Sequence, residues 1–207
     1  PDRARVEELR ASHGLAGRRV VMYTGNLEGY QGIDLLLDAF ARVARADARS
    51  MLVLVGGARA QIARVRERTA ALGIADRVVL TGPRPASEMP EWMALGDVLV
   101  SPRLHGTNTP LKLYSYMWSA VPIVATALPT HTQVLHDTTA VLCAPTPEAL
   151  ADGLLAVLAR PDSFARLGVA AHLRVARDFS RDAFRRKLQF AYDIVGRGIR
   201  STVATSM

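Results

Sequence analysis

SPRLHGTNTPLKLYSYMWSAVPIVAT, residues 101–126, contains the end of an apolar run, a polar loop, an amphipathic segment and a second apolar run. Thr109 suits the N-cap of a helix and Pro110 the first helical position, so we predict strand, loop, helix and strand. A helix that begins past the carboxyl end of a parallel strand directs backbone N–H groups and its positive dipole end toward an anion. Lys112, in the first turn, adds a point charge. We therefore predict a binding site for a phosphorylated ligand at this loop.

The same alternation extends along the chain. The apolar runs that we take as strands cover residues 20–23, 51–55, 78–80, 98–100, 123–125 and 140–143. Runs that are continuous, without polar alternation, are typical of strands covered on both faces. Helical patterns between them predict βαβ units. We therefore expect an α/β fold, a Rossmann-like open parallel sheet of about six strands with helices on both faces.

Three helices are predicted after the last strand, over residues 147–158, 163–178 and 180–195, with Ser180 as the cap of the third. The segment 196–207 has no periodic pattern, and we predict a disordered tail there. Residues 1–17 are polar with weak helical spacing. Because the chain begins with Pro1 and not with Met, we expect them to lead in from an upstream part of a longer protein.

The composition limits the classes of partner. The 207 residues are 49% hydrophobic and carry a net charge of +7, which favours an anionic ligand, nucleic acid or an anionic membrane surface. The sequence has no dense basic run and no alternation of basic and aromatic residues, so we expect no nucleic acid. No apolar run reaches the ~18 residues of a membrane span, no signal peptide is visible, and the single Cys143 makes no internal disulfide. We predict a cytoplasmic protein, with peripheral attachment to the inner face of the membrane left open.

Small residues recur where the predicted strands end. Gly25 and Asn26 follow the first strand, Gly56 and Gly57 the second, and Arg103 follows the fourth. Glycine permits a positive φ or a close approach of backbone to ligand, and ligands of open parallel sheets bind beyond the carboxyl ends of the strands. A single such turn is more often ordinary, but the recurrence at one edge predicts the site. Neither a GxGxxG fingerprint nor a GxxxxGK[ST] loop is present.

These motifs together resemble the donor-binding, C-terminal half of GT-B glycosyltransferases, in particular the retaining group 1 family (glycosyltransferase family 4). The resemblance covers about residues 18–195. YTGNLEGYQGIDLLLDAF, LVLVGG and VVLTGPRPASEMPEWM correspond to the family's successive strand ends and following helices. The most specific agreement is PLKLYSYMWSAVPIVAT, which is similar to the family pattern P-x-K-x-x-E-Y-M-x-x-G-x-P-I-V-A-T.

The resemblance implies an enzyme that moves a sugar from a nucleotide diphosphate sugar to an acceptor with retention of configuration. The nucleotide sugar is then a co-substrate, and no further cofactor is expected. We predict metal independence, because no His, Cys or carboxylate cluster has zinc spacing and no Asp-x-Asp follows a strand. In the family another catalytic group, typically a histidine, comes from the N-terminal acceptor-binding domain. We therefore expect this chain to be inactive alone.

By the same resemblance, the base lies near Arg84, the ribose near Ser115 and the sugar beside residues 106–108. The diphosphate lies at the start of the helix after Thr109, where Arg103 and Lys112 would contribute charge. The donor-binding residues that we predict are Gly25, Asn26, Gly56, Gly57, Arg84, Arg103, Gly106, Thr107, Asn108, Thr109, Leu111, Lys112 and Ser115.

The sequence departs from the family at charged positions. Its two glutamates, eight positions apart, correspond to Thr107 and Ser115, and Thr107 occupies the position of the first, next to the transferred sugar. An Arg and a Lys that hold the diphosphate in many members align with Asn26 and Gln31, and Ala120 replaces a glycine. Charge-assisted hydrogen bonds are roughly twice as strong as neutral ones, so the usual mode of donor binding should be weakened.

Two other readings remain. The chain is a non-catalytic module for nucleotide, sugar or protein binding, which the lost glutamates favour, or another GT-B enzyme such as a sugar-nucleotide epimerase or a glycan phosphorylase. A phosphorylase needs a lysine for pyridoxal phosphate, and the chain offers Lys112 and Lys187.

His131 and His136, five positions apart with Asp137 adjacent, are expected to have a structural or surface role. The alternatives are that His131 faces the sugar or phosphate, or that the histidines bind a metal. Trp92 and Trp118 are expected in core or interdomain packing.

Overall fold

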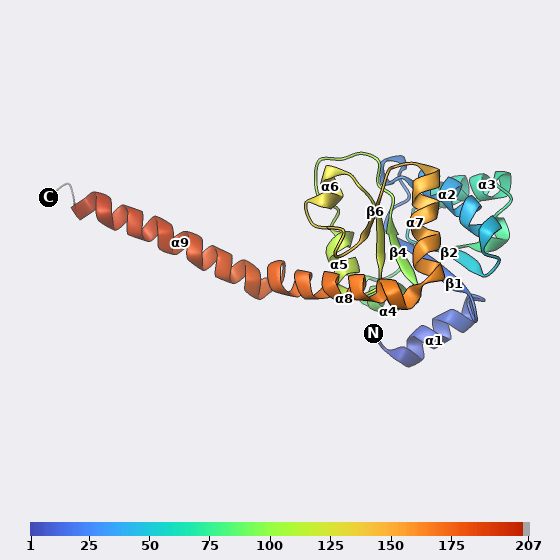
Figure 1. The fold of residues 1–207 in the computed structure, drawn as a ribbon, viewed down its shortest axis with the longest axis horizontal. Helices are drawn as coiled ribbons and strands as arrows, with labels where there is room; N and C mark the ends of the chain where they lie inside the picture. The colour runs from blue at the N-terminus through green and yellow to red at the C-terminus, as the bar shows by residue number, and fades with distance from the viewer. Residues whose placement is uncertain (205–207) are drawn as a thin grey trace.

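The computed structural model describes residues 1–204, with the exposure of side chains defined for residues 1–194. These residues form an open, all-parallel sheet with the strand order β3-β2-β1-β4-β5-β6 (Figure 1). The predicted fold class is confirmed. The strands are β1 Arg19–Thr24, β2 Ser50–Val55, β3 Val78–Gly82, β4 Val98–Ser101, β5 Ile123–Thr126 and β6 Val141–Cys143. The helices are α1 Arg3–Ser12, α2 Ile33–Ala46, α3 Arg59–Ala71, α4 Met89–Ala94, α5 Lys112–Trp118, α6 Pro129–Thr132, α7 Pro147–Ala159, α8 Pro161–Asp178 and α9 Arg181–Ala204.

The sheet is covered on both faces because successive residues of each strand point to opposite sides. Val21 and Tyr23 pack with α2, α3 and α7, whereas Val20 and Met22 pack with α1, α4, α5 and α8. All four side chains are fully buried. This explains why the strands read as unbroken apolar runs. The apolar stripe of α2, which the sequence predicts from Ile33 onward, is buried against the first of these layers.

The order of the strands creates the crevice of the fold. The chain moves outward from β1 to β2 and β3, then returns to place β4 on the other side of β1 before it continues to β5 and β6. The loops after β1 and β4 therefore diverge on opposite sides of the sheet. Ligands of doubly wound sheets bind at such a reversal, outside the carboxyl ends of the strands.

The two ends of the chain both form helices. Residues 1–17 contain α1, and both Leu9 and Leu15 are buried in the layer that also holds α4, so this segment packs on the domain that it leads into. At the other end, α9 continues to Ala204 where a disordered tail was predicted from residue 196. Residues 205–207 lie outside the described residues.

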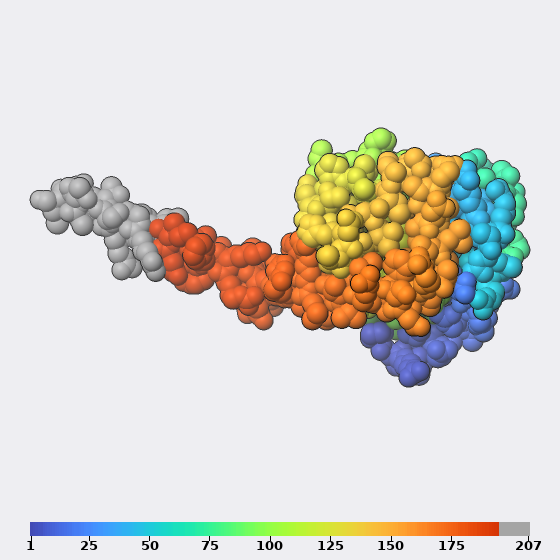
Figure 2. Space-filling view, in the orientation of Figure 1, coloured from blue at the N-terminus to red at the C-terminus, as the bar shows by residue number. Residues whose placement is uncertain are grey.

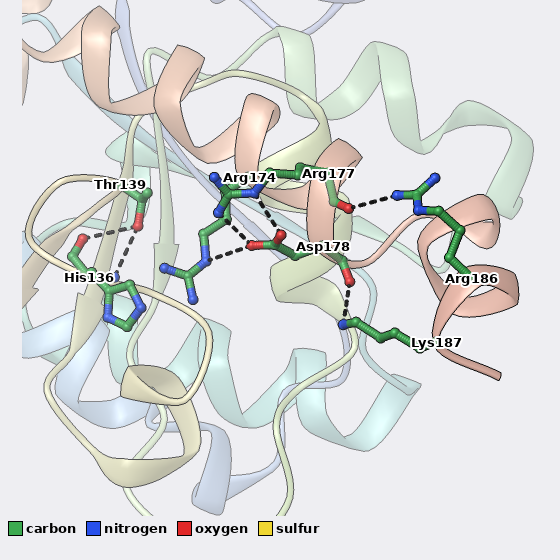
Figure 3. A network of polar contacts seen from close by, with 7 residues as sticks. All are labelled: His136, Thr139, Arg174, Arg177, Asp178, Arg186 and Lys187. Carbon is green, nitrogen blue, oxygen red and sulfur yellow. Dashed lines mark hydrogen bonds and ion pairs between the residues drawn. The ribbon is translucent and has the colours of Figure 1, made fainter. Parts of the chain in front are cut away.

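The junction of α8 and α9 is held by polar contacts around Asp178 (Figure 3). Arg177 Nε and Nη2 donate to the Asp178 carboxylate at 2.7 and 2.8 Å, and Lys187 Nζ donates to the Asp178 carbonyl oxygen at 3.0 Å. Ser180 caps α9 as predicted, since its Oγ accepts from Ala183 N. Beyond this junction residues 181–194 of α9 project away from the body of the domain (Figure 2). Its large apolar side chains are exposed, namely Phe184, Leu188, Phe190, Tyr192 and Ile194.

The two tryptophans have different environments. Trp92 is fully buried in the layer with α1, which agrees with the predicted core packing. Trp118, at the end of α5, is exposed, and its ring lies 5.1 Å from that of His172 on α8. Within this chain, Trp118 is therefore not a core residue.

We expect Gly32→Ala to lower the free energy of unfolding by about 3 kcal/mol, from left-handed backbone strain and overpacking. Gly32 has a φ of 76°, and an added Cβ would overlap the Pro102 carbonyl oxygen. Gly29→Ala is the matched control, because a Cβ there meets nothing within 4 Å and the residue lies in the same loop. Urea denaturation of both variants measures the difference. Equal free energies of unfolding for the two variants would contradict the close approach of Gly32 to the Pro102 carbonyl oxygen.

Candidate functional site

Three strand ends interlock at the carboxyl edge of the sheet. Gly25 N donates to Val55 O and Gly56 N donates to Gly82 O, both at 2.9 Å. Gly25 and Gly56 have φ values of 133° and 121°, and a Cβ on Gly56 would overlap the carbonyl oxygen of Gly25. Backbone packing thus requires a glycine at position 56, and the positive φ favours glycine at Gly25, Gly56 and Gly57. These glycines line a cavity of about 360 Å³ that also includes Asn26, Pro83 and Arg84.

Lys112 reaches this edge from the first turn of α5. Its Nζ donates to Gln31 Oε1 at 3.2 Å, lies 3.9 Å from the centre of the Tyr23 ring and would be 3.0 Å from a Cβ on Gly25. Burial, with a smaller contribution from the positive charge of Arg103, lowers the pKa of Lys112 to about 7. In the part of the chain that the structure describes, Lys112 makes no ion pair. A bound anion would supply the missing partner.

Tyrosine hydroxyls, which the sequence analysis did not single out, hold the backbone around Gly25. Thr24 N donates to the Tyr116 hydroxyl at 2.8 Å, and the Tyr23 hydroxyl donates to Asn26 O at 2.7 Å. Burial raises the pKa of Tyr116 to about 12 and that of Tyr23 further, so both hydroxyls stay protonated, Tyr116 as an acceptor and Tyr23 as a donor. The apolar runs around these tyrosines gave no sign of this role, because a buried tyrosine reads as core.

The start of α5 differs from the sequence prediction. The helix begins at Lys112 and makes no side-chain cap, and the Thr109 hydroxyl instead donates to Gln133 Oε1 at 3.1 Å. The predicted N-cap and the helical position of Pro110 are therefore wrong. Leu113 N donates to the Pro110 carbonyl oxygen, so this N–H of the first turn is not free to bind an anion. Leu111 is 81% exposed.

Arg103 does not point its guanidinium into open space for a phosphate. Only 6% of the residue is exposed, and its Nε donates to His105 O at 2.7 Å. Its two terminal nitrogens donate to Asn108 O and Asn108 Oδ1, at 2.9 and 3.1 Å. The group also lies 5.4 Å from the Tyr30 ring centre. A Cβ on Gly106 would overlap the guanidinium. The hydrogen bonds of the Arg103 guanidinium are therefore made to the polar loop.

The remaining predicted residues are only partly brought together. Thr107 and Asn108 are exposed in the polar loop beside the crevice. Ser115 is also exposed, but it lines a separate apolar groove of about 710 Å³ between α4, α5 and α8, which shares Met89 with the glycine-lined cavity. The structure therefore places the expected ribose position in the apolar groove and not in the glycine-lined cavity.

His131 has a structural role, which was the first of its predicted readings. It is fully buried, and its ring bridges the ends of β4 and β5. Nδ1 lies 2.7 Å from Thr126 O and must carry the proton, since a carbonyl only accepts, so Nε2 accepts from Ser101 Oγ at 3.0 Å. Burial lowers its pKa, which keeps the ring neutral. Among the described residues, no three His, Cys, Asp or Glu side chains gather as metal ligands.

Comparison with known proteins identifies the family. A family model described as "Glycosyl transferases group 1" matches residues 18–160. The chain belongs to the group 1 glycosyltransferases.

Relatives and solved structures agree with this membership. Alpha-D-kanosaminyltransferase of Streptomyces kanamyceticus is 27% identical over 196 residues, which is 93% of this chain and 50% of that protein. A GDP-mannose-dependent alpha-(1-6)-phosphatidylinositol monomannoside mannosyltransferase of Mycolicibacterium smegmatis is 28% identical, over 82% of this chain and 46% of that protein. This glycosyltransferase chain thus spans about half the length of these relatives.

The solved structures share the fold at low sequence identity. Anabaena Alr3699/HepE in complex with UDP superposes with a TM-score of 0.83 at 19% identity, covering 95% of this chain and 54% of that one. Sucrose-phosphate synthase from Thermosynechococcus elongatus gives 0.79 at 24% identity, covering 93% and 49%. The group 1 domain is therefore the Rossmann-like half of a GT-B fold.

We expect Lys112→Met to remove a rise in stability with pH. The pKa of Lys112 is about 7 in the folded chain and that of an unfolded lysine about 10.4, so between these values the unfolded chain binds more protons and the folded state gains stability as pH rises. Between about pH 7 and about pH 9, the free energy of unfolding should rise by about 2 kcal/mol more in the wild type than in the variant. Urea denaturation at both pH values measures this, and identical slopes for the two proteins would show that Lys112 titrates normally.

Proposed function

We propose that this chain is the donor-binding half of a retaining glycosyltransferase, which moves a sugar from a nucleotide diphosphate sugar to an acceptor. Family membership supports the reaction class. The observation that carries the proposal for this site is Lys112, which makes no ion pair within the part of the chain that the structure describes and lies beside the Gly25 turn at the reversal of strand order. Lys112 is half-buried, and a charge that is partly removed from water is costly without a counter-charge. The diphosphate of a donor would supply that counter-charge.

In this arrangement the diphosphate lies next to the Lys112 ammonium, and Gly25 and Gly56 let it approach the backbone. The base extends toward Pro83 and Arg84 in the cavity, and the sugar toward residues 106–108. The departing nucleotide diphosphate then develops its charge beside a fixed cation, which is electrostatic stabilisation of the transition state. Such a mechanism is compatible with the loss of the family's glutamates.

Gln31 and Lys112 together suggest how the site adjusts to its missing charges. Gln31 stands where many members have a lysine, and its amide oxygen accepts from Lys112 Nζ. The ammonium of Lys112 is thereby brought to the loop after β1 from the opposite side of the crevice. In the proposal, Lys112 replaces the missing lysine as the charge that binds the diphosphate. Thr107 and Ser115 would supply neutral hydrogen bonds to hydroxyls.

The proposal also covers the part of the active site that lies outside this chain. In a protein as long as the relatives, the other half would contain an acceptor-binding domain, and this chain alone would not catalyse sugar transfer. No metal and no further cofactor is assigned a role.

None of the described helices is both long and apolar enough to cross a membrane. We propose a cytoplasmic location, since the buried thiol of Cys143 needs no oxidising compartment.

We expect one of UDP, GDP and ADP to bind this chain, and Lys112→Ala to weaken it about tenfold or more, the effect of removing a charged hydrogen bond. More than one nucleotide is tested because Alr3699/HepE was solved with UDP, whereas the mycobacterial relative is named for GDP-mannose. Since an anion raises the depressed pKa of Lys112, binding above about pH 7 should take up a proton. Calorimetry in buffers of different ionisation enthalpy measures affinity and proton uptake together.

Lys187→Ala is the control, because Lys187 is the other lysine of the sequence and lies at the α8–α9 junction. If a folded wild-type chain binds none of the three nucleotides, the non-catalytic module becomes the better reading. If one nucleotide binds equally to wild type and Lys112→Ala, the diphosphate does not lie at Lys112.

A further inference from the structure

The polar loop 105–108 has little support of its own. Its residues are exposed and contribute no side chain to the buried core. Its shape depends on Arg103, whose guanidinium donates to two of its carbonyl oxygens and to the side chain of Asn108. Three of the five N–H donors of the guanidinium are thus used on one short loop.

Arg103 is in turn fixed from behind by buried polar groups. The Thr126 hydroxyl donates to the Arg103 carbonyl oxygen at 2.7 Å, and Thr126 is fully buried. His131 binds the Thr126 backbone and Ser101, so the ends of β4 and β5 are joined on either side of Arg103. None of these groups is exposed to a ligand in the crevice. They can act on a ligand only through the position of the loop.

The loop is also tied to the first strand end. Leu104 N donates to the Tyr30 carbonyl oxygen at 3.1 Å, and the Tyr30 ring lies against the guanidinium. The Tyr30 hydroxyl accepts from Asn26 Nδ2 at 3.3 Å. Arg103 therefore lies between the loop after β1 and the loop after β4, which are the two sides of the crevice.

We propose that Arg103 is a positioning residue, which holds the 105–108 loop in the shape that receives the sugar of the donor and does not itself contact the diphosphate. This inference rests on the proposed function. A loop whose acceptors are already bonded needs no ordering when the sugar arrives, which is the advantage of preorganisation. Lysine cannot replace the planar fork, because an ammonium is a compact point charge on a flexible stem.

The test uses Arg103→Lys, which keeps the charge, and Thr126→Val, which removes the hydroxyl behind it. Arg10→Lys is the matched control, since Arg10 also donates to backbone carbonyls, of Leu15, Arg18 and Leu95, before β1 and away from the crevice. For each protein, calorimetry gives the Kd of UDP, GDP and ADP and of their glucose conjugates. Hydrogen exchange followed by NMR reports the order of the amides at residues 105–109 and, in the core strands, whether the variant is folded.

We expect Arg103→Lys to leave the Kd of the nucleotide diphosphate unchanged and to raise that of its glucose conjugate about tenfold or more, as a displaced loop misplaces its contacts with the sugar. The amides of residues 105–109 should exchange faster. Thr126→Val should change the same two quantities in the same direction, and Arg10→Lys neither. If Arg103→Lys does not fold, Thr126→Val decides the question, because it leaves the guanidinium in place.

Two results would overturn the proposal. Equal weakening of the nucleotide and its glucose conjugate in Arg103→Lys would show that Arg103 contacts the diphosphate. Faster exchange of the loop with an unchanged ratio of the two Kd values would show that the loop does not receive the sugar. If the wild type binds no nucleotide at all, the proposed function fails and the positioning role fails with it, whereas the exchange data still report on the loop.

Discussion

The close approach of the Gly32 backbone to the Pro102 carbonyl oxygen determines the geometry of the crevice. It brings the start of α2 against the end of β4, and only glycine combines the required φ with the absence of a Cβ. As a result, Gln31 and Tyr30 come within reach of Lys112 and Arg103. The loops after β1 and β4 diverge at this point, and the close approach, together with the hydrogen bond from Leu104 N to Tyr30 O, keeps them side by side.

The fold could be predicted from sequence because its signals are local and repeated. Every strand covered on both faces needs a continuous apolar run, and the runs at residues 51–55 and 98–100 correspond to β2 and β4 within one residue. The structure of the segment after residue 195 was harder to predict. A helix that projects from its domain has no core to face, so the segment after residue 195 lacks the periodicity by which helices are recognised, although α9 reaches Ala204.

The sequence predicts which strand ends meet at the candidate site, but not the contacts of the side chains there. Glycines at strand ends mark the crevice in any doubly wound sheet, whereas the direction of a side chain depends on groups far away in sequence. Arg103 was expected to bind phosphate because its charge is visible in the sequence, and the carbonyl oxygens of His105 and Asn108 that bind it are not. For Thr109, the nearby amide of Gln133 competes with the role of a cap. Propensity cannot anticipate such a partner.

The depressed pKa of Lys112 has a consequence for covalent chemistry. An amine with a pKa of about 7 has a substantial uncharged, nucleophilic fraction near neutral pH, and the chain has only one other lysine. Acylating or aldehyde-bearing reagents that fit the crevice would therefore modify one predetermined position without engineering. An anion seated at the same place would protect it, because it would return the proton to the nitrogen. The feature that suits this crevice to an anion also makes it a selective target for an affinity label.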